Sequence, residues 1–245
     1  MVEPMFWSEF SKEPLAGDRF ELGGSEGKHA ASVRRMRVGE AIQLTDGAGL
    51  RVRGLVSDAL PKSLVITIES VERESPAKNQ ITLIQALAKG DRDELAIQAA
   101  TELGAVSVIP WQAERSISRW DAAKSAKGQA RWQIICDEAA KQSLSTHFPK
   151  VEHPLDTAAL AQVVKKFDQV LVLDPTAQLG LGALGVPKGS IALVVGPEGG
   201  ISPEELVLLE NAGARRVHLG ESILRTSTAG IAAIAAIQTL SGQYH

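Results

Sequence analysis

The sequence has a single cysteine, a single tyrosine and no long hydrophobic run. One cysteine, Cys136, excludes an internal disulfide and a multi-cysteine zinc site, which is typical of a protein from a reducing compartment. The longest apolar stretch, residues 229–237, is far shorter than the roughly 20 residues that cross a bilayer. The first residues also lack the basic start and continuous apolar core of a signal peptide. The sequence therefore predicts a cytoplasmic protein with no membrane partner.

An excess of positive charge is absent as well, because 26 Lys and Arg residues oppose 29 Asp and Glu residues, for a formal net charge of −3. The chain as a whole should not be attracted to nucleic acid, so any RNA contact must come from a local basic face. No group of His, Cys or carboxylate residues has the spacing of metal ligands, so we expect no metal. The length of 245 residues, with 44% apolar residues, predicts one or two folded domains.

Two kinds of hydrophobic pattern divide the chain. Residues 41–72 alternate between polar and apolar side chains and contain two turn signals, which predicts a small antiparallel β unit. From residue 81 onward, short apolar runs alternate with helical stretches, which predicts an α/β domain with a parallel sheet. The polar, proline-containing segment 73–79 has the composition of a linker. We therefore expect domains at residues 1–74 and 75–245. The apolar runs cover residues 81–84, 106–109, 170–173, 191–195 and 217–219.

The first of two strand-to-helix junctions follows Val195 and has the sequence Gly-Pro-Glu-Gly-Gly at residues 196–200. A helix should begin directly after it, because Ser202 and Glu205 have the spacing of a capping box around a proline at the first helical position. Three glycines in five positions permit positive φ angles and the close approach of another molecule. The pattern matches neither a dinucleotide fingerprint nor a P-loop, so an ordinary turn remains an alternative.

The second junction, residues 218–229, leads from a strand through a loop into an apolar helix over residues 229–240. The hydroxyl groups of residues 226–228 are predicted to cap this helix. Ile223 and Leu224 form an apolar pair inside the loop, which gains burial only if the pair lines a pocket or an interface. Arg225 places a charge beside them, and taken alone it is better explained by a surface role.

Together these segments resemble the RsmE family of SPOUT methyltransferases, which methylate N3 of a uridine in 16S ribosomal RNA. The likeness is carried by residues 196–200, by Leu-Gly at 219–220 and by Ile-Leu-Arg-Thr at 223–226. Two positions depart from the family pattern. Ser227 stands where the family usually has Glu, and Leu144-Ser145 stand where it usually has Gly-Arg. Further matching segments span nearly the whole chain, at residues 29–36, 89, 102–105, 114–116, 138 and 142–143.

The resemblance implies an α/β protein with two domains. The N-terminal domain would be a small PUA-like β-barrel that binds RNA, and the C-terminal domain a SPOUT-type, trefoil-knotted α/β methyltransferase domain. The resemblance also implies S-adenosylmethionine as cofactor, 16S ribosomal RNA or the small ribosomal subunit as substrate, and a homodimer. The loops that would hold the cofactor comprise Leu173, Gly196, Pro197, Glu198, Gly199, Gly200, Leu219, Gly220, Ile223, Leu224 and Thr226.

The implied reaction needs help at N3 of uracil, which is a poor nucleophile until its proton leaves and negative charge spreads onto the neighbouring carbonyl oxygens. Arg225 is the predicted catalytic residue that stabilises this anion. Glu198 is a second catalytic candidate, and accepts the proton if burial raises its pKa; otherwise it only orders the glycine loop through hydrogen bonds.

RNA contacts are expected where arginines concentrate within 20 residues of an otherwise balanced chain, since phosphate binding needs such a patch. This basic stretch contains Arg34, Arg35 and Arg37, followed by Arg51 and Arg53. A solvated basic face is the alternative. The residues predicted to bind RNA are His29, Arg34, Arg35, Arg37 and Arg115.

Three other functions stay open at this point. A non-catalytic RNA-binding module would explain the β unit and its arginines but would leave both glycine junctions unused. A nucleotide-dependent oxidoreductase would use such junctions, yet no G-x-G-x-x-G follows a strand here. Ribose 2′-O-methylation by a protein of the same fold is the nearest competitor, and it is distinguished only by the identity of the methylated atom.

Overall fold

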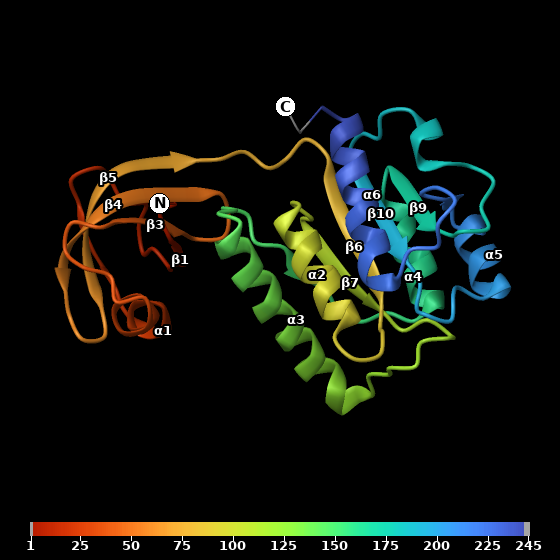
Figure 1. The fold of residues 1–245 in the computed structure, drawn as a ribbon, viewed down its shortest axis with the longest axis horizontal. Coiled ribbons are helices and arrows are strands. Elements are labelled where there is room, and N and C mark those ends of the chain that lie inside the picture. The colour runs from red at the N-terminus through yellow and green to blue at the C-terminus, as the bar shows by residue number, and fades with distance from the viewer. Residues whose placement is uncertain (1, 243–245) are drawn as a thin grey trace. The chain divides into compact units, whose positions relative to one another are not determined.

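The computed structural model describes residues 2–242, which divide into two compact units (Figure 1). Unit 1 contains the residues up to Pro76 together with Ala140–Phe148, and unit 2 contains Ala77–Ala139 and the residues from Pro149 onward. Of the expected linker 73–79, residues 74–79 lie between the last strand of unit 1 and the first strand of unit 2, whereas Arg73 is the final residue of the unit 1 strand. Within the described residues, no helix is long and apolar enough to span a membrane.

Unit 1 is built on a five-stranded sheet in the order β1-β3-β4-β5-β2. β1 runs parallel to β3, and the other neighbouring strands are antiparallel. The antiparallel β unit predicted for residues 41–72 is therefore confirmed, but the two N-terminal strands were not predicted because each is short and β2 is mostly polar. The strands are β1 (Met5–Trp7), β2 (Arg19–Leu22), β3 (Ala41–Thr45), β4 (Leu50–Ala59) and β5 (Leu64–Arg73).

A short helical segment connects β2 to β3 in unit 1. α1 (Gly24–Lys28) continues directly into the π-helical turn η1 (His29–Val33). Gly27 is required here, because a Cβ atom at this position would lie only 2.1 Å from the carbonyl oxygen of Leu22. Ala30 and Met36 are buried with the strand residues in the core of the unit, whereas the basic residues around them stay at the surface.

Arg51, on β4, holds residues 140–148 to the sheet of unit 1. Its Nε donates to Glu74 Oε1 at 2.6 Å, and its other nitrogens donate to the side chain of Gln43 and to the carbonyl oxygen of Leu144. The hydroxyl of Thr146 donates to the second carboxylate oxygen of Glu74 at 2.7 Å. The Arg51 side chain is only 12% exposed. Arg51 is therefore a structural residue and does not belong to the RNA-binding patch of arginines that the sequence suggested.

Unit 2 contains a six-stranded sheet in the order β11-β9-β10-β6-β7-β8, in which every neighbouring pair is parallel. The predicted parallel α/β arrangement is confirmed, and each of the five apolar runs falls in or overlaps a strand. β8 was not predicted, because a two-residue strand leaves no pattern. The strands are β6 (Gln80–Ala86), β7 (Ser107–Trp111), β8 (Lys150–Val151), β9 (Gln169–Leu173), β10 (Ser190–Val195) and β11 (Arg215–Val217).

Helices cover both faces of this sheet (Figure 1). On one face, Leu83 and Leu193 of the sheet share a core with residues of α2, α3 and α6, such as Ile234. On the other face, Val194 packs in a core with residues of α4 and α5, such as Leu209. The α-helices are α2 (Arg92–Glu102), α3 (Ala122–Gln142), α4 (Thr157–Val163), α5 (Pro203–Asn211) and α6 (Thr226–Leu240), and two short 3₁₀ turns are η2 (Val164–Lys166) and η3 (Leu181–Leu184).

Replacing Arg51 tests its structural role in unit 1. Arg51→Met should lower the free energy of unfolding by about 2 kcal/mol, because it leaves several hydrogen-bond acceptors without a donor. Arg53→Met, on the same strand but exposed, is the control and should change the free energy of unfolding by less than about 0.5 kcal/mol. Urea denaturation measures both values. Equal effects of the two substitutions would contradict the role of Arg51.

The difference in the free energy of unfolding between wild type and Arg51→Met should also depend on pH. Burial alone would raise the pKa of Glu74, but hydrogen bonds from Arg51 and Thr146 outweigh burial and hold this pKa below its ordinary value of 4.5. A lowered folded-state pKa contributes stability above the ordinary pKa that is lost as the pH falls through the folded-state value. The difference between wild type and Arg51→Met should therefore shrink when the pH is lowered below 4.5.

Candidate functional site

A cavity of about 860 Å³ lies where β9, β10 and β11 end in unit 2. The last residues of these strands, Leu173, Val195 and Val217, all line it. Parallel strands bring their carboxyl ends to one edge of a sheet, and open α/β sheets bind ligands at that edge. The cavity volume is within the range of about 300–1,000 Å³ that is usual for small-molecule sites.

The structure brings the two glycine-containing junctions together around this cavity. Gly199 is the one predicted cofactor residue that does not line the cavity. A Cβ atom at this position would lie 3.2 Å from the Cβ of Arg115, so the glycine lets the loop around Arg115 pack closely. The other predicted cofactor residues do line the cavity: Leu173, Gly196, Pro197, Glu198, Gly200, Leu219, Gly220, Ile223, Leu224 and Thr226.

Gly200 and Gly220 give the cavity wall an open backbone. Their φ angles are +72° and +134°, which side-chain-bearing residues rarely adopt. A Cβ atom built on either glycine meets no protein atom within 4 Å. A bound molecule therefore has access to the backbone at both positions.

The start of α6 is fixed by the hydroxyl of Thr226. This hydroxyl donates to the carbonyl oxygen of Gly196 at 2.8 Å and accepts from the Nε2 of Gln85, a fully buried residue of β6, at 2.9 Å. α6 begins at Thr226 rather than at residue 229, and its N-cap, Arg225, forms no side-chain capping bond. The prediction that the hydroxyls of residues 226–228 cap the helix is therefore wrong, because the Thr226 hydroxyl joins the second junction to the first.

Arg225 is exposed and lines the cavity. Its side chain has no hydrogen bond or ion pair with any residue in the range 2–242. Ile223 and Leu224 line the cavity beside it, and Ile223 is 80% exposed. The loop thus presents one cation and an apolar surface that a bound molecule can cover.

Glu198 links the first glycine junction to the start of α2. Its Oε1 accepts from the backbone N–H of Lys89 at 3.0 Å and from Nη1 of Arg92 at 2.8 Å. Burial alone would raise the pKa of Glu198, but hydrogen bonds from its own backbone, from Lys89 and from Arg92 hold this pKa below its ordinary value. The condition set for Glu198 as a proton acceptor, a raised pKa, is therefore not met.

The cavity wall contains a second ion pair, between Asp174 and Arg216, that the sequence analysis did not predict. Asp174, directly after β9, is buried and accepts from Nε of Arg216 on β11 at 2.7 Å and from both the backbone and the hydroxyl of Thr176. Burial alone would raise the pKa of Asp174, but these hydrogen bonds and the Arg216 charge hold it below its ordinary value. An aspartate immediately after a predicted strand was the available signal, because such a residue lies at the ligand-binding edge.

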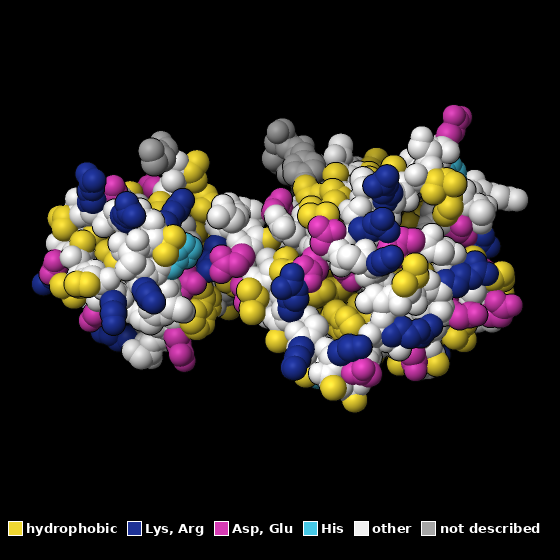
Figure 2. All heavy atoms as spheres, turned by 60° about the horizontal axis from the view of Figure 1, so that its bottom comes forward, with side chains coloured by type: hydrophobic (Ala, Val, Ile, Leu, Met, Phe, Trp, Pro, Cys, Tyr) yellow, Lys and Arg dark blue, Asp and Glu magenta, His cyan; other side chains and the backbone are white. Residues whose placement is uncertain are grey.

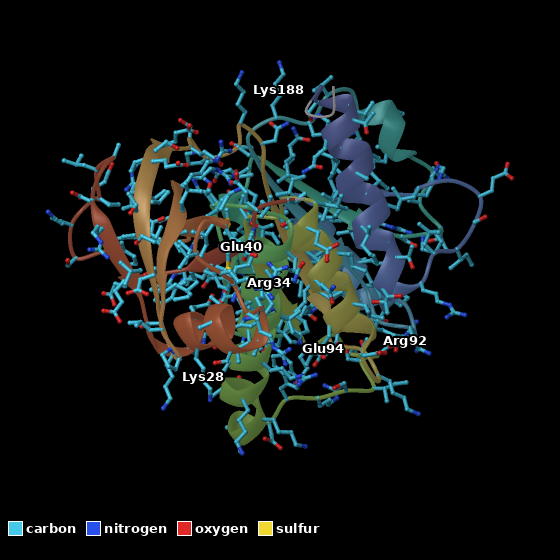
Figure 3. The ribbon with its side chains drawn as sticks, turned by 60° about the vertical axis from the view of Figure 1, so that its left-hand side comes forward. Lys28, Arg34, Glu40, Arg92, Glu94 and Lys188 are labelled. Atoms are coloured by element: carbon cyan, nitrogen blue, oxygen red, sulfur yellow. The ribbon has the colours of Figure 1, made fainter. Side chains whose placement is uncertain are left out.

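The RNA-binding candidates of unit 1 lie around η1. His29, Arg34, Arg35 and Arg37 are all exposed, and the ring of His29 contacts Phe6 edge-on at 6.0 Å between centroids. Figure 3 labels Arg34, and Figure 2 shows Lys and Arg side chains spread over unit 1 among acidic ones.

Arg35 has an unusual backbone conformation, with a φ angle of +55°. A left-handed conformation costs a residue with a side chain about 1–2 kcal/mol and is normally assigned to glycine. Leu144 adopts the same conformation, so the positive φ angle alone assigns no role to the Arg35 side chain. Arg115, the fifth RNA-binding candidate, belongs to unit 2, lines the cavity and donates from Nη1 to the carbonyl oxygen of Gly199 at 3.3 Å.

Metal binding has no candidate site in the described part of the chain. Among residues 2–242, no group of three or more His, Cys, Asp or Glu side chains could hold a metal ion.

Two family models match the chain. A model described as an RNA methyltransferase domain matches residues 74–238, and one described as an RNA methyltransferase PUA domain matches residues 22–69. The curated protein "Ribosomal RNA small subunit methyltransferase E" of Mycobacterium tuberculosis is 41% identical over 236 residues, which cover 94% of this chain and 90% of that protein. The protein of the same name from Bacillus subtilis is 34% identical over 244 residues, covering 95% and 94%.

Solved structures resemble the whole chain. A methyltransferase from Legionella pneumophila, crystallised with bound S-adenosylmethionine, has a TM-score of 0.88 at 29% identity, with 98% of each chain covered. A ribosomal RNA small subunit methyltransferase E from Neisseria gonorrhoeae, also bound to S-adenosylmethionine, has a TM-score of 0.85 at 31% identity, again with 98% of each chain covered.

Replacing Thr226 tests the connection between the two junctions. Thr226→Val should lower the free energy of unfolding by about 1–3 kcal/mol, because the Gly196 carbonyl loses its donor and the buried Gln85 amide loses one of its two acceptors. Thr228→Val, on the exposed side of the same helical turn, should change it by less than about 0.5 kcal/mol. Chemical denaturation of both variants measures the difference. A Thr226→Val protein as stable as the control would contradict this role of the hydroxyl.

Proposed function

Because the chain belongs to the ribosomal RNA small subunit methyltransferase E family, we propose that it transfers a methyl group from S-adenosylmethionine to N3 of a uridine in 16S ribosomal RNA. The observation that carries this proposal is the single cavity lined by both glycine-containing junctions at the ends of β9, β10 and β11. A non-catalytic RNA-binding module would have no use for this cavity. The two relatives of known structure that are named above were crystallised with S-adenosylmethionine.

The residues around the cavity fit S-adenosylmethionine. The open backbone at Gly200 and Gly220 leaves room for a ligand that approaches peptide groups closely. Leu219 and Leu224 offer apolar surface for the adenosine part, and backbone groups of residues 196–200 are available for its polar atoms. When bound, S-adenosylmethionine supplies a methyl group that its sulfonium makes electrophilic.

Arg225 is assigned to the uracil. Its guanidinium is always charged and carries several N–H donors in one plane. It therefore stabilises the negative charge that forms on the uracil carbonyl oxygens when the N3 proton leaves. Its freedom from other partners among the described residues supports this role. We assign Glu198 to positioning rather than to proton transfer, because a lowered pKa makes it a weaker base and its Oε1 already accepts hydrogen bonds from Lys89 and Arg92. The N3 proton then passes to solvent.

The domain roles are part of the same proposal. We assign residues 1–74 to a PUA-like β-barrel that binds RNA through His29, Arg34, Arg35 and Arg37, and residues 75–245 to a trefoil-knotted SPOUT domain with Arg115 as a further RNA contact. We also propose a homodimer in the cytoplasm. The exposed apolar side chains of Val207 on α5 and Ile223 support a subunit interface, and light scattering at micromolar concentration tests it.

Mass spectrometry of nucleosides from 16S ribosomal RNA tests the proposed reaction. A strain that lacks the gene should lose N3-methyluridine, and purified protein with S-adenosylmethionine should restore it. Loss of a ribose 2′-O-methylated nucleoside instead would favour the competing reaction. Unchanged nucleosides would leave only an RNA-binding role.

Replacing Arg225 separates chemistry from binding. Arg225→Ala should lower the single-turnover methylation rate at saturating RNA by roughly 10²-fold, the scale of losing one group that stabilises an oxyanion. The dissociation constant of S-adenosylmethionine, measured by calorimetry, should change little. Full recovery of the rate at saturating RNA would show that Arg225 only binds RNA.

Replacing Arg35 separates RNA binding from folding. Arg35→Gly removes the charge but relieves the left-handed backbone, so the melting temperature should stay within about 3 °C of wild type. RNA affinity should fall, and the slope of log affinity against log salt should decrease by about 0.7–0.9, the value for one lost phosphate contact. An unchanged salt slope would remove Arg35 from the RNA-binding surface.

A further inference from the structure

The cavity lining contains arginines to which the proposed reaction gives no role. Arg92, Arg115 and Arg225 all line the cavity, with Glu198 as the carboxylate beside Arg92. The fourth arginine of the lining, Arg216, is held by Asp174 through two of its nitrogens. The lining therefore contains four arginines and three carboxylates, and two of these carboxylates, Asp174 and Glu210, lie within ion-pair distance of Arg216.

Arg92 is held in place by only one of its nitrogens. Nη1 donates to Glu198 Oε1 at 2.8 Å, and no other bond of the guanidinium to a residue in the range 2–242 is present. The Arg92 side chain is 45% exposed. Because a guanidinium has five N–H donors, most of them remain available at the cavity rim.

The carboxylate that holds Arg92 is itself fixed. Glu198 belongs to the glycine junction and also accepts the backbone N–H of Lys89 at 3.0 Å. Arg92 begins α2 (Figure 3), so the ion pair joins the start of this helix to the loop that lines the cavity. The guanidinium thus has a defined position while most of its donors face no protein partner among the described residues.

A nucleotide whose base occupies the cavity carries a phosphate on each side of its sugar. A uracil reaches a cavity at the end of a sheet only when its nucleotide is turned out of the RNA stack, and the phosphates on either side of it stay outside the cavity. A planar guanidinium with free donors matches phosphate oxygens in charge and geometry. We infer that Arg92 binds a phosphate next to the target uridine, with Glu198 as its positioning residue.

This inference rests on the proposed function, so the wild-type protein must first bind S-adenosylmethionine and methylate RNA. A wild-type protein that does neither would overturn the proposed function irrespective of Arg92. The test then measures binding of an RNA fragment that contains the methylated uridine, at several salt concentrations, together with the affinity for S-adenosylmethionine.

Arg131 provides the matched control. Like Arg92, it is an exposed arginine paired with a glutamate, although it bonds Glu94 of α2 through two nitrogens and Arg92 bonds Glu198 through one; it does not line the cavity. Arg92→Ala should weaken RNA binding about tenfold and lower the salt slope by about 0.7–0.9, with less than a twofold change in S-adenosylmethionine affinity. Arg92→Lys should recover part of the loss because it keeps the charge. Arg131→Ala should bind RNA within twofold of wild type.

Glu198→Gln tests the positioning role. Removing the negative charge of Glu198 would by itself strengthen RNA binding. Loss of the hydrogen bond that positions the Arg92 guanidinium would weaken it. We expect the second effect to be larger, with RNA binding about threefold weaker. When Arg92 is already alanine, Glu198→Gln should no longer weaken RNA binding, because no guanidinium remains to be positioned and only the effect of the removed charge is left. Tighter RNA binding by Glu198→Gln would contradict the positioning role. Unchanged RNA binding by Arg92→Ala, or weaker binding of S-adenosylmethionine alone, would overturn the assignment of Arg92 to a phosphate.

Discussion

The meeting of three parallel strands at one sheet edge is the constraint on which the site depends. β9, β10 and β11 end side by side, so the loops that follow Leu173, Val195 and Val217 surround one cavity although they are far apart in the sequence. The Thr226 hydroxyl then joins the loop after β11 to the loop after β10. An antiparallel sheet would send neighbouring loops to opposite edges and would form no such cavity.

Ion pairs divide the arginines of the chain into different roles. Arg51 donates to Glu74, Gln43 and Leu144, and Arg216 is bound by Asp174 through two nitrogens, so both arginines fix structure. Arg92 is held by one nitrogen, and Arg225 by none of the described residues. Hydrogen bonds hold the carboxylates of these pairs ionised, since the pKa values of Glu74, Asp174 and Glu198 all lie below their ordinary values despite the opposing effect of burial. The number of partners, rather than the presence of an arginine, distinguishes structural residues from those available to a substrate.

The sequence predicted the parallel sheet and the capping box at Ser202, because each leaves a local pattern of apolar residues or caps. The grouping of the two glycine junctions was implied by the family resemblance and not by such a pattern. The sequence did not predict the attachment of residues 140–148 to unit 1, which depends on side-chain bonds to Arg51 across a long sequence separation. Leu144 illustrates the same limit. It adopts a φ angle of +56°, at a position where the family usually has glycine, and no propensity rule assigns leucine to that conformation.

A crystal structure of the protein with S-adenosylhomocysteine, the product of methyl transfer, tests the central claim most directly. The account predicts the ligand in the cavity at the ends of β9, β10 and β11, in contact with residues 196–200 and with the loop that ends at Thr226. Arg225 should lie on the side of the ligand that carries the sulfur atom. A ligand bound elsewhere on the chain, or Arg225 on the opposite side from the sulfur, would contradict it.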